Sequence, residues 1–251
     1  MKRQNVRKLV LIISLLAFPL TLYYFSPALI ITASMEGIIN GSFIVFATML
    51  VCSVFLGRLF CSYLCPAGGL QECLALAQKK PPKKGWRSYI KYAVWLIWIS
   101  VVVASYVYHG ETLRIDFLFE TEHGISVANI YGYIIYYGII ALILLPAVIG
   151  GKRAFCHYFC WMAPFMILGT KIRRTLGLPG VRISADPSKC TSCLRCNKGC
   201  PMSLDVNSMV KTGGIDSVEC IQCGECVDGF LSYTMSKPLS SLRSESSSTM
   251  G

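Results

Sequence analysis

Charged residues are scarce in this sequence. Asp, Glu, Lys and Arg make up 15% of its 251 residues, whereas a typical soluble domain contains about a quarter. Hydrophobic residues make up 54% and stand in blocks, which excludes an ordinary soluble domain and favours a membrane protein. Acidic residues are the rarer kind, with 13 Asp and Glu against 24 Lys and Arg. Most basic residues flank apolar segments, so this excess indicates membrane topology and not nucleic-acid binding.

Nucleotide-binding motifs are missing. No GxGxxG pattern occurs, and Gly68 and Gly69 in CPAGGLQ lack both a following Lys-Ser/Thr and a preceding strand. The sequence therefore excludes direct hydride exchange with NAD(P)H. His157 stands alone beside the last apolar block, so it cannot supply the paired axial ligands of a membrane b-haem. It is either an interfacial polar residue or a ligand or proton-transfer group.

Four apolar blocks predict four transmembrane helices. They cover residues 9–25, 43–56, 92–108 and 130–149. The second block is short for a span of about 20 residues, so we expect residues 28–41 either to extend it or to re-enter the membrane. The first block is interpreted as an uncleaved anchor and not as a signal peptide, because no small-residue cleavage site follows it.

The loop charges orient these helices. Residues 1–8, 58–91 and 152–182 carry four, seven and six Lys or Arg, whereas residues 109–127 carry only Arg114 and residues 26–42 carry none. The positive-inside rule then places both termini and the middle loop on the cytoplasmic side. We therefore expect a multi-pass protein of a prokaryotic cytoplasmic membrane.

An internal repeat relates the segments that follow the second and fourth blocks. GRLFCSYLCP (57–66) aligns with KRAFCHYFCW (152–161), which pairs Arg58 with Arg153 and departs at Trp161, where the first copy has Pro66. Each copy holds a CX3C pair, and a spacing of four puts both thiols on one helical face. Together the pairs could hold a soft metal or a further Fe–S cluster. The four candidate ligands are Cys61, Cys65, Cys156 and Cys160.

Cysteine also has a simpler interpretation in a membrane helix, as a small apolar residue. We accept that interpretation for Cys52 and Cys73, which have no counterpart in the repeat. For the matched pairs a redox or ligand role is favoured, because the repeat preserves each cysteine together with its neighbours.

The C-terminal part carries ferredoxin spacing. The first motif fits C-x2-C-x2-C-x3-C-P, in which the fourth cysteine ligates the other cluster of a two-cluster ferredoxin. Zinc usually takes two separate CxxC pairs and needs no third, evenly spaced cysteine. Such thiols must stay reduced, which again indicates the cytoplasmic side. The predicted ligands are Cys190, Cys193, Cys196 and Cys200 of the first motif and Cys220, Cys223 and Cys226 of the second.

The second motif lacks its fourth cysteine. Phe230 stands at that position, and the chain reads as if a short piece were deleted before a final strand over 230–236. One 4Fe-4S cluster is therefore complete, held by Cys200 and the three cysteines of the second motif. The other has three thiolates and an open iron corner, so we expect a [3Fe–4S] form or a substoichiometric site. Asp228 is the nearest substitute ligand.

These features predict a mainly α membrane protein with a C-terminal α+β domain. Residues 1–180 would form four transmembrane helices arranged as two repeated hairpins. Residues 181–236 would form a two-cluster ferredoxin-like domain. The Ser-rich residues 237–251 would form a disordered tail.

The motifs, the four spans and the FCSYLCPAGGLQE stretch (60–72) resemble the NapH-type membrane ferredoxins. These are the quinol dehydrogenase subunits that accompany periplasmic nitrate reductase. The nitrous oxide reductase regulator and the cytochrome oxidase accessory polyferredoxins are similar to them. The resemblance implies electron transfer between the quinone pool and a redox partner subunit. The alternative is a maturation or regulatory protein that reduces or holds a metal for another membrane redox enzyme.

Overall fold

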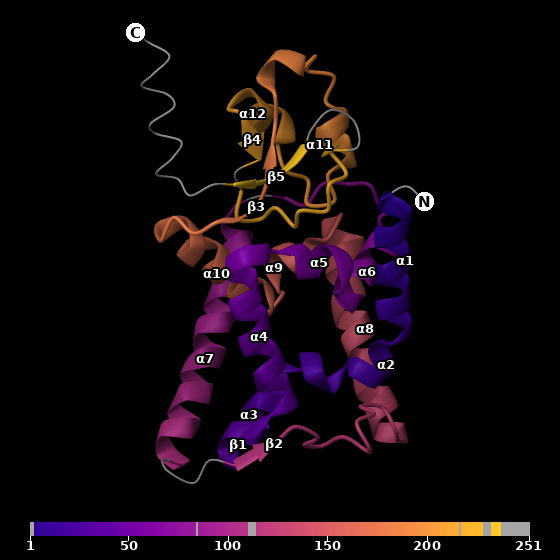
Figure 1. Cartoon of the computed structure of the whole chain (residues 1–251). Coiled ribbons are helices and arrows are strands. Elements are labelled where there is room, and N and C mark those ends of the chain that lie inside the picture. The colour runs from indigo at the N-terminus through magenta and orange to yellow at the C-terminus, as the bar shows by residue number, and fades with distance from the viewer. Residues whose placement is uncertain (1–2, 84, 110–113, 216, 228–231, 237–251) are drawn as a thin grey trace. The chain divides into compact units, whose positions relative to one another are not determined.

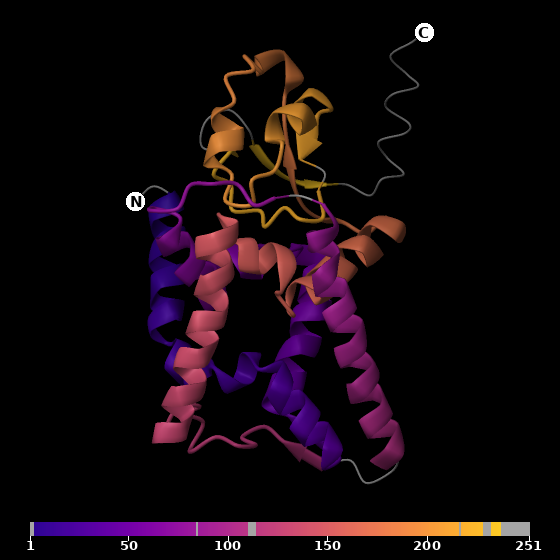
Figure 2. The ribbon, with the colours of Figure 1, turned by 180° about the vertical axis from the view of Figure 1, so that it is seen from behind.

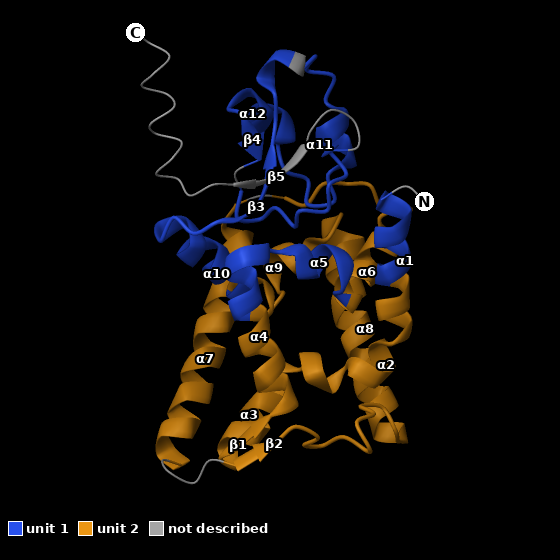
Figure 3. Ribbon diagram, in the orientation of Figure 1, with its two compact units in different colours: residues 1–11, 50–65, 165–251 blue, residues 12–49, 66–164 orange. Residues whose placement is uncertain are grey.

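The structure is a computed structural model that describes residues 1–251 except 1–2, 84, 110–113, 216, 228–231 and 237–251 (Figure 1). Phe230, Asp228 and the predicted tail therefore lie outside the described residues. The chain forms two compact units (Figure 3). The first comprises Met1–Leu11, Leu50–Cys65 and Phe165–Gly251, and the second comprises Ile12–Met49 and Pro66–Pro164. The predicted domain boundaries at 180 and 236 stay predictions.

The second unit is built almost entirely from helices. Its elements are α1 (Arg3–Leu16) from Ile12, α2 (Phe18–Thr21), η1 (Tyr23–Phe25), α3 (Pro27–Met35), β1 (Ile38–Asn40), α4 (Gly41–Leu56) up to Met49, α6 (Pro66–Leu74), η2 (Trp86–Tyr89), α7 (Ile90–His109), β2 (Arg114–Asp116), α8 (Ile130–Gly150) and α9 (Ala154–Tyr158).

Two helices are long and apolar enough to cross a membrane. They are Trp86–His109, which joins η2 and α7, and Ile130–Gly150, which is α8. Only 11% and 17% of their apolar windows are buried, so their sides are not covered as the core helices of a soluble protein would be. Gly41–Leu56 is a shorter apolar helix. By length and composition, the described residues thus provide two of the four predicted spans.

The first apolar block is interrupted. Helix α1 ends at Leu16, and α2 begins after Ala17 with Pro19 in its first turn. A proline lacks the backbone N–H that would continue the hydrogen bonding of the preceding helix. Residues 9–25 therefore do not form the single continuous helix that the sequence predicts.

Loops that the charge pattern assigns to one side of the membrane meet in the second unit. Strands β1 and β2 pair in parallel, which joins residues 38–40 to residues 114–116 at the end of the unit where α7 ends and α8 begins (Figure 2). Elsewhere, Lys152 N donates to Lys80 O at 2.8 Å, and Tyr158 Oη donates to Lys83 O at 2.6 Å. Predicted outer loops thus contact each other, and so do predicted inner ones.

The first unit has a small antiparallel sheet. Its further elements are α5 (Leu59–Tyr63), α10 (Ala163–Thr175) from Phe165, β3 (Gly180–Ser184), η3 (Pro187–Lys189), α11 (Arg195–Gly199), α12 (Val206–Lys211), β4 (Gly214–Ile215) and β5 (Ser232–Ser236). The strand order is β4-β3-β5, with both neighbours antiparallel to β3. The predicted final strand is therefore present as β5.

A compact apolar core lies between this sheet and α12. It consists of the buried side chains of Ile183, Val206, Val210 and Ile215. Cysteines from both ferredoxin motifs pack against it, namely Cys190, Cys196, Cys200, Cys220 and Cys226. Burial of these four aliphatic side chains helps to hold the two motifs on one scaffold.

Candidate functional site

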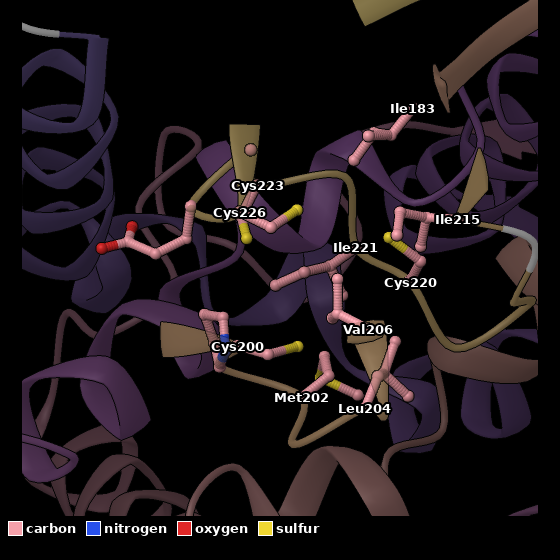
Figure 4. A pocket seen from close by; sticks show the side chains of 13 residues that line it. Ile183, Cys200, Met202, Leu204, Val206, Ile215, Cys220, Ile221, Cys223 and Cys226 are labelled. Atoms are coloured by element: carbon pink, nitrogen blue, oxygen red, sulfur yellow. The ribbon is translucent and has the colours of Figure 1, made fainter. Parts of the chain in front are cut away.

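Cysteines from the two ferredoxin motifs line one pocket of the first unit. Cys200 comes from the first motif, and Cys220, Cys223 and Cys226 come from the second. In the close view Cys223 and Cys226 appear together, whereas Cys220 and Cys200 appear apart from them, with Ile221 in between (Figure 4). Apolar side chains complete the lining, including Met202, Leu204 and Val206. The pocket thus places Cys200 with the three cysteines of the second motif, and the crossed ligand assignment stays a prediction.

The spacing of these sulfur atoms bears on the kind of metal group. Four thiolates on one zinc ion, each about 2.3 Å from the metal, would lie within about 4 Å of one another. In the part of the chain that the structure describes, no three His, Cys, Asp or Glu side chains are close enough to hold a single ion. Thiolates around a multi-iron cluster lie farther apart, because each binds a different iron. Four cysteine thiols among apolar side chains are a donor set that suits a 4Fe–4S cluster, and cluster binding by these four stays a prediction.

The two cysteine loops have the same unusual backbone. Between the first and second cysteines, Ser192 and Gln222 have φ angles of 52° and 56°. Directly after the second cysteine, Leu194 and Gly224 have φ angles of 58° and 72°. A left-handed conformation is strained for residues other than glycine and persists mostly at functional sites. The two cysteine loops therefore share one backbone conformation at these positions.

Backbone N–H groups point at sulfur atoms in both loops. Gln222 N donates to Cys220 Sγ at 3.4 Å. In the first loop, the backbone N–H of Arg195 is the main group that lowers the pKa of Cys193. Such N–H···S bonds stabilise negative charge on sulfur, which every thiolate ligand of a cluster carries.

Burial distinguishes the second loop. It raises the pKa of the Cys220 thiol to about 11 and that of the Cys223 thiol to about 12. It also raises the pKa of Cys226 above its ordinary value. Thiols with such pKa values stay protonated near neutral pH unless a metal replaces the proton. Cys223 is buried, whereas Cys193 is exposed, so the second loop offers the more enclosed site.

The CX3C pairs lie in different units. Cys61 and Cys65 belong to the first unit, and Cys156 and Cys160 belong to the second. All four are buried. A shared four-cysteine centre therefore stays a prediction. Cys52 and Cys73 are exposed, and His157 is buried.

The first cysteine of each pair contacts a side chain that sequence analysis did not single out. Cys61 Sγ lies 3.7 Å from Met166 Sδ within the first unit. Within the second unit, Gln71 Nε2 donates to Cys156 Sγ at 3.1 Å. Gln71 follows Cys61 by ten residues, and Met166 follows Cys156 by ten. Equal offsets within the repeat are the signal that would have identified both.

The repeated arginines also have corresponding partners. Arg58 Nη1 lies 2.7 Å from Glu219 Oε2, and Arg153 Nη2 lies 2.7 Å from Glu72 Oε2. Both arginine side chains are 1% exposed. Glu219 directly precedes Cys220, so the first arginine connects a CX3C segment to a ferredoxin loop. The sequence identifies the arginine pair but not the glutamates.

Family models match most of these features. Residues 41–84 and 131–179 both match a model described as a 4Fe-4S binding domain, and each match contains one CX3C pair. Residues 182–229 match a model described as a 4Fe-4S dicluster domain, which covers all seven ferredoxin cysteines. One family model thus recognises both copies of the repeat.

Three relatives are similar over most of the chain. MJ0750 and MJ0749, two uncharacterised proteins of Methanocaldococcus jannaschii, are 27% and 26% identical to it over 71% and 74% of its length, which is 71% and 68% of theirs. YccM of Escherichia coli strain K12, provisionally named an electron transport protein, is 22% identical over 83% of this chain and 60% of its own length. No solved structure matches. The chain thus carries 4Fe-4S binding domains of the ferredoxin type.

Proposed function

We propose that this protein is a membrane-bound iron–sulfur electron-transfer protein that works between the quinone pool and a redox partner. The observation that carries the proposal is the pocket in which Cys200 joins the cysteines of the second motif. These four side chains would hold the complete 4Fe-4S cluster. Cys190, Cys193 and Cys196 would hold the cluster with the open iron corner. When bound, such clusters supply one-electron redox chemistry, and the protein supplies their positions and potentials.

The membrane part of the proposal has four spans arranged as two repeated hairpins, with the cysteine pairs and both termini on the cytoplasmic side. The two long apolar helices and the distribution of Lys and Arg support it. Contacts between β1 and β2 and between Lys80 and Lys152 agree with these side assignments. The name of YccM supports the electron-transport role.

The CX3C pairs would form one further metal or Fe–S centre. The two matches to one 4Fe-4S model and the equally spaced contacts of Cys61 and Cys156 support equivalent roles for the pairs. This centre would lie near the inner membrane surface, where a quinone from the membrane would approach. The NapH-type resemblance is the reason to place a quinol on the donor or acceptor side.

A reoxidation experiment tests the proposed function. The protein, purified anaerobically and reduced with dithionite, should be reoxidised rapidly by a soluble quinone analogue, with the bleached iron–sulfur absorbance returning. The matched control is Cys200→Ser, which should lack the complete cluster and the rapid phase. If the clusters were intact but were not reoxidised by the quinone analogue, the quinone part of the proposal would be contradicted.

A second candidate function rests on the contact between Cys61 and Met166. A thiol and a thioether 3.7 Å apart are soft donors of the kind that select Cu(I). In this alternative the protein reduces or holds a metal for another membrane enzyme. Two results together would favour this alternative over electron transfer. The protein would bind copper stoichiometrically and lose that binding in Cys61→Ser, and its clusters would not be reoxidised by quinone.

A further inference from the structure

We propose that Arg7 and Arg58 are positioning residues that hold the second cysteine loop, residues 219–226, against the first CX3C segment, residues 57–65. We further propose that their charges raise the reduction potential of the cluster on that loop. The inference rests on the proposed function, because it requires a cluster on Cys200 and the three cysteines of the second motif. All the residues concerned belong to the first unit.

Arg58 contacts one end of the second cysteine loop. Its Nη1 atom lies 2.7 Å from Oε2 of Glu219, the residue before Cys220. The Arg58 side chain is 1% exposed and that of Glu219 is 22% exposed. Arg58 itself stands three residues before Cys61. One largely buried ion pair thus ties the start of the CX3C segment to the start of the cluster loop.

Arg7 contacts the other end of the loop. Its Nη2 atom lies 3.6 Å from Glu225 Oε2, and its Nη1 atom donates to the backbone oxygen of Ser62 at 3.4 Å. Ser62 stands between Cys61 and Cys65, and Glu225 stands between Cys223 and Cys226. The Arg7 side chain is fully buried. A second guanidinium group therefore bridges the same two segments.

The first turns of α1 bind the loop backbone as well. Arg3 Nη2 donates to Gly224 O at 2.7 Å, and Gln4 Nε2 donates to Cys223 O at 3.1 Å. Gln4 also accepts a hydrogen bond from Arg7 Nε at 2.6 Å. The contacts of Arg3 and Gln4 with the loop join residues more than 200 positions apart in the chain. They would keep Arg7 in place beside the loop whether or not a cluster is bound.

The two segments approach so closely that a side chain at Gly57 would require the Gln222 amide to shift. A Cβ atom at Gly57 would lie 2.9 Å from both terminal atoms of the Gln222 amide, and its φ of +60° also favours glycine. The Gln222 amide is held in turn by a hydrogen bond from its Nε2 to Val181 O at 2.7 Å. This contact is independent of both arginines and places the middle of the loop on the CX3C segment.

Charge explains why Arg7 and Arg58 should affect the reduction potential of the cluster. Reduction adds one negative charge to a cluster, and buried cations beside it stabilise that charge more than exposed ones do, because little water screens them. Charge and hydrogen bonding around the sulfur atoms are established determinants of cluster potential. The glutamate partners offset part of this effect, so removing one charge from either pair should shift the potential in a predictable direction.

A redox titration monitored by electron paramagnetic resonance tests the inference on the full chain. Arg58→Gln and Arg7→Gln should each lower the ratio of reduced to oxidised complete cluster at a given potential about tenfold, equivalent to about 59 mV for a one-electron couple. Iron content should stay the same. The matched control is Lys211→Gln, which removes one positive charge from an exposed position of the same unit. It should leave the ratio unchanged.

Charge-restoring variants separate electrostatics from packing. Glu219→Gln should raise the ratio, and Arg58→Gln combined with Glu219→Gln should return it toward that of the native protein. Arg58→Lys should restore most of the ratio that Arg58→Gln loses. Unchanged ratios in cluster-loaded arginine variants would overturn the inference. If Arg58→Gln or Arg7→Gln lost its cluster, the ratio would be measured in Glu219→Gln instead. An unchanged ratio of reduced to oxidised cluster in that variant would also overturn the inference. A native protein without clusters would instead contradict the proposed function itself.

Discussion

The side-chain amide of Gln71 donates a hydrogen bond to the thiol of Cys156, with 3.1 Å between Nε2 and Sγ. Met166 holds the corresponding place at Cys61, where the two sulfur atoms are 3.7 Å apart. Each contacting residue follows the cysteine of its own repeat copy by ten positions and contacts the cysteine of the other copy. This reciprocity is what a parallel internal repeat would produce, and it makes the two CX3C sites comparable residue by residue.

The repeat predicts how position 166 responds to substitution. Met166→Gln introduces the residue that the other copy carries, and its amide could donate to Cys61 as Gln71 does to Cys156. We expect it to be tolerated, whereas Met166→Ala, which empties a buried site, should cost about 2–5 kcal/mol. Melting temperatures in detergent would check this. If the two variants were equally destabilised, the sites would not be equivalent.

Cys200 should be required for one cluster only. Cys200→Ser should remove the complete cluster, with the loss of about four irons per chain and a matching loss of acid-labile sulfide. Cys190→Ser is the matched control, because it should affect only the first loop. Iron analysis with paramagnetic resonance of the reduced protein would distinguish the two losses. Identical spectra for the two variants would contradict the crossed ligand arrangement.

The cluster on Cys190, Cys193 and Cys196 should lose iron most easily. In the proposed arrangement one iron corner has no thiolate, so brief exposure to air should give the signal of an oxidised [3Fe–4S] cluster, and the complete cluster should persist. Two indistinguishable, air-stable [4Fe–4S] signals would mean that another ligand closes that corner. Phe230→Cys should suppress the [3Fe–4S] signal if the shortened loop still reaches the cluster.

Glu72 should stabilise the fold through Arg153. Glu72→Gln would leave the Arg153 side chain, which is 1% exposed, without its carboxylate. Breaking one side of a buried ion pair costs about 3–5 kcal/mol, so the apparent free energy of unfolding should fall by that order. Replacing both residues by methionine should cost less. Chemical unfolding in detergent followed by circular dichroism would measure each difference.

The orientation in the membrane can be tested with single cysteines. Lys79→Cys and Leu118→Cys, both at exposed positions, would be compared in a background without other reactive thiols. An impermeant thiol reagent applied to intact cells should label position 118 and not position 79, because the basic loop is expected to face the cytoplasm. The reverse pattern would invert the proposed topology.

The sequence alone determined the cofactor class and the long helices. Ferredoxin spacing within 190–201 and 220–226 is local, because neighbouring cysteines can reach neighbouring irons only at certain separations. The sequence also shows that the second motif has Phe230 in place of its fourth cysteine. The third and fourth apolar blocks became α7 and α8 because continuous apolar runs of that length form helices that can cross a membrane.

The tertiary structure decided what lies beside the cysteines. In the sequence, Arg7 is one of the basic residues that indicate membrane topology. Its contact with Glu225 depends on bringing together residues more than 200 positions apart. The bond between Arg58 and Glu219 likewise depends on how the ferredoxin loops pack on the CX3C segment. Pro19 divided the first apolar block, which hydropathy alone did not reveal. Ligand spacing is set by covalent geometry over a few residues, whereas the charges around a ligand depend on packing of the whole unit.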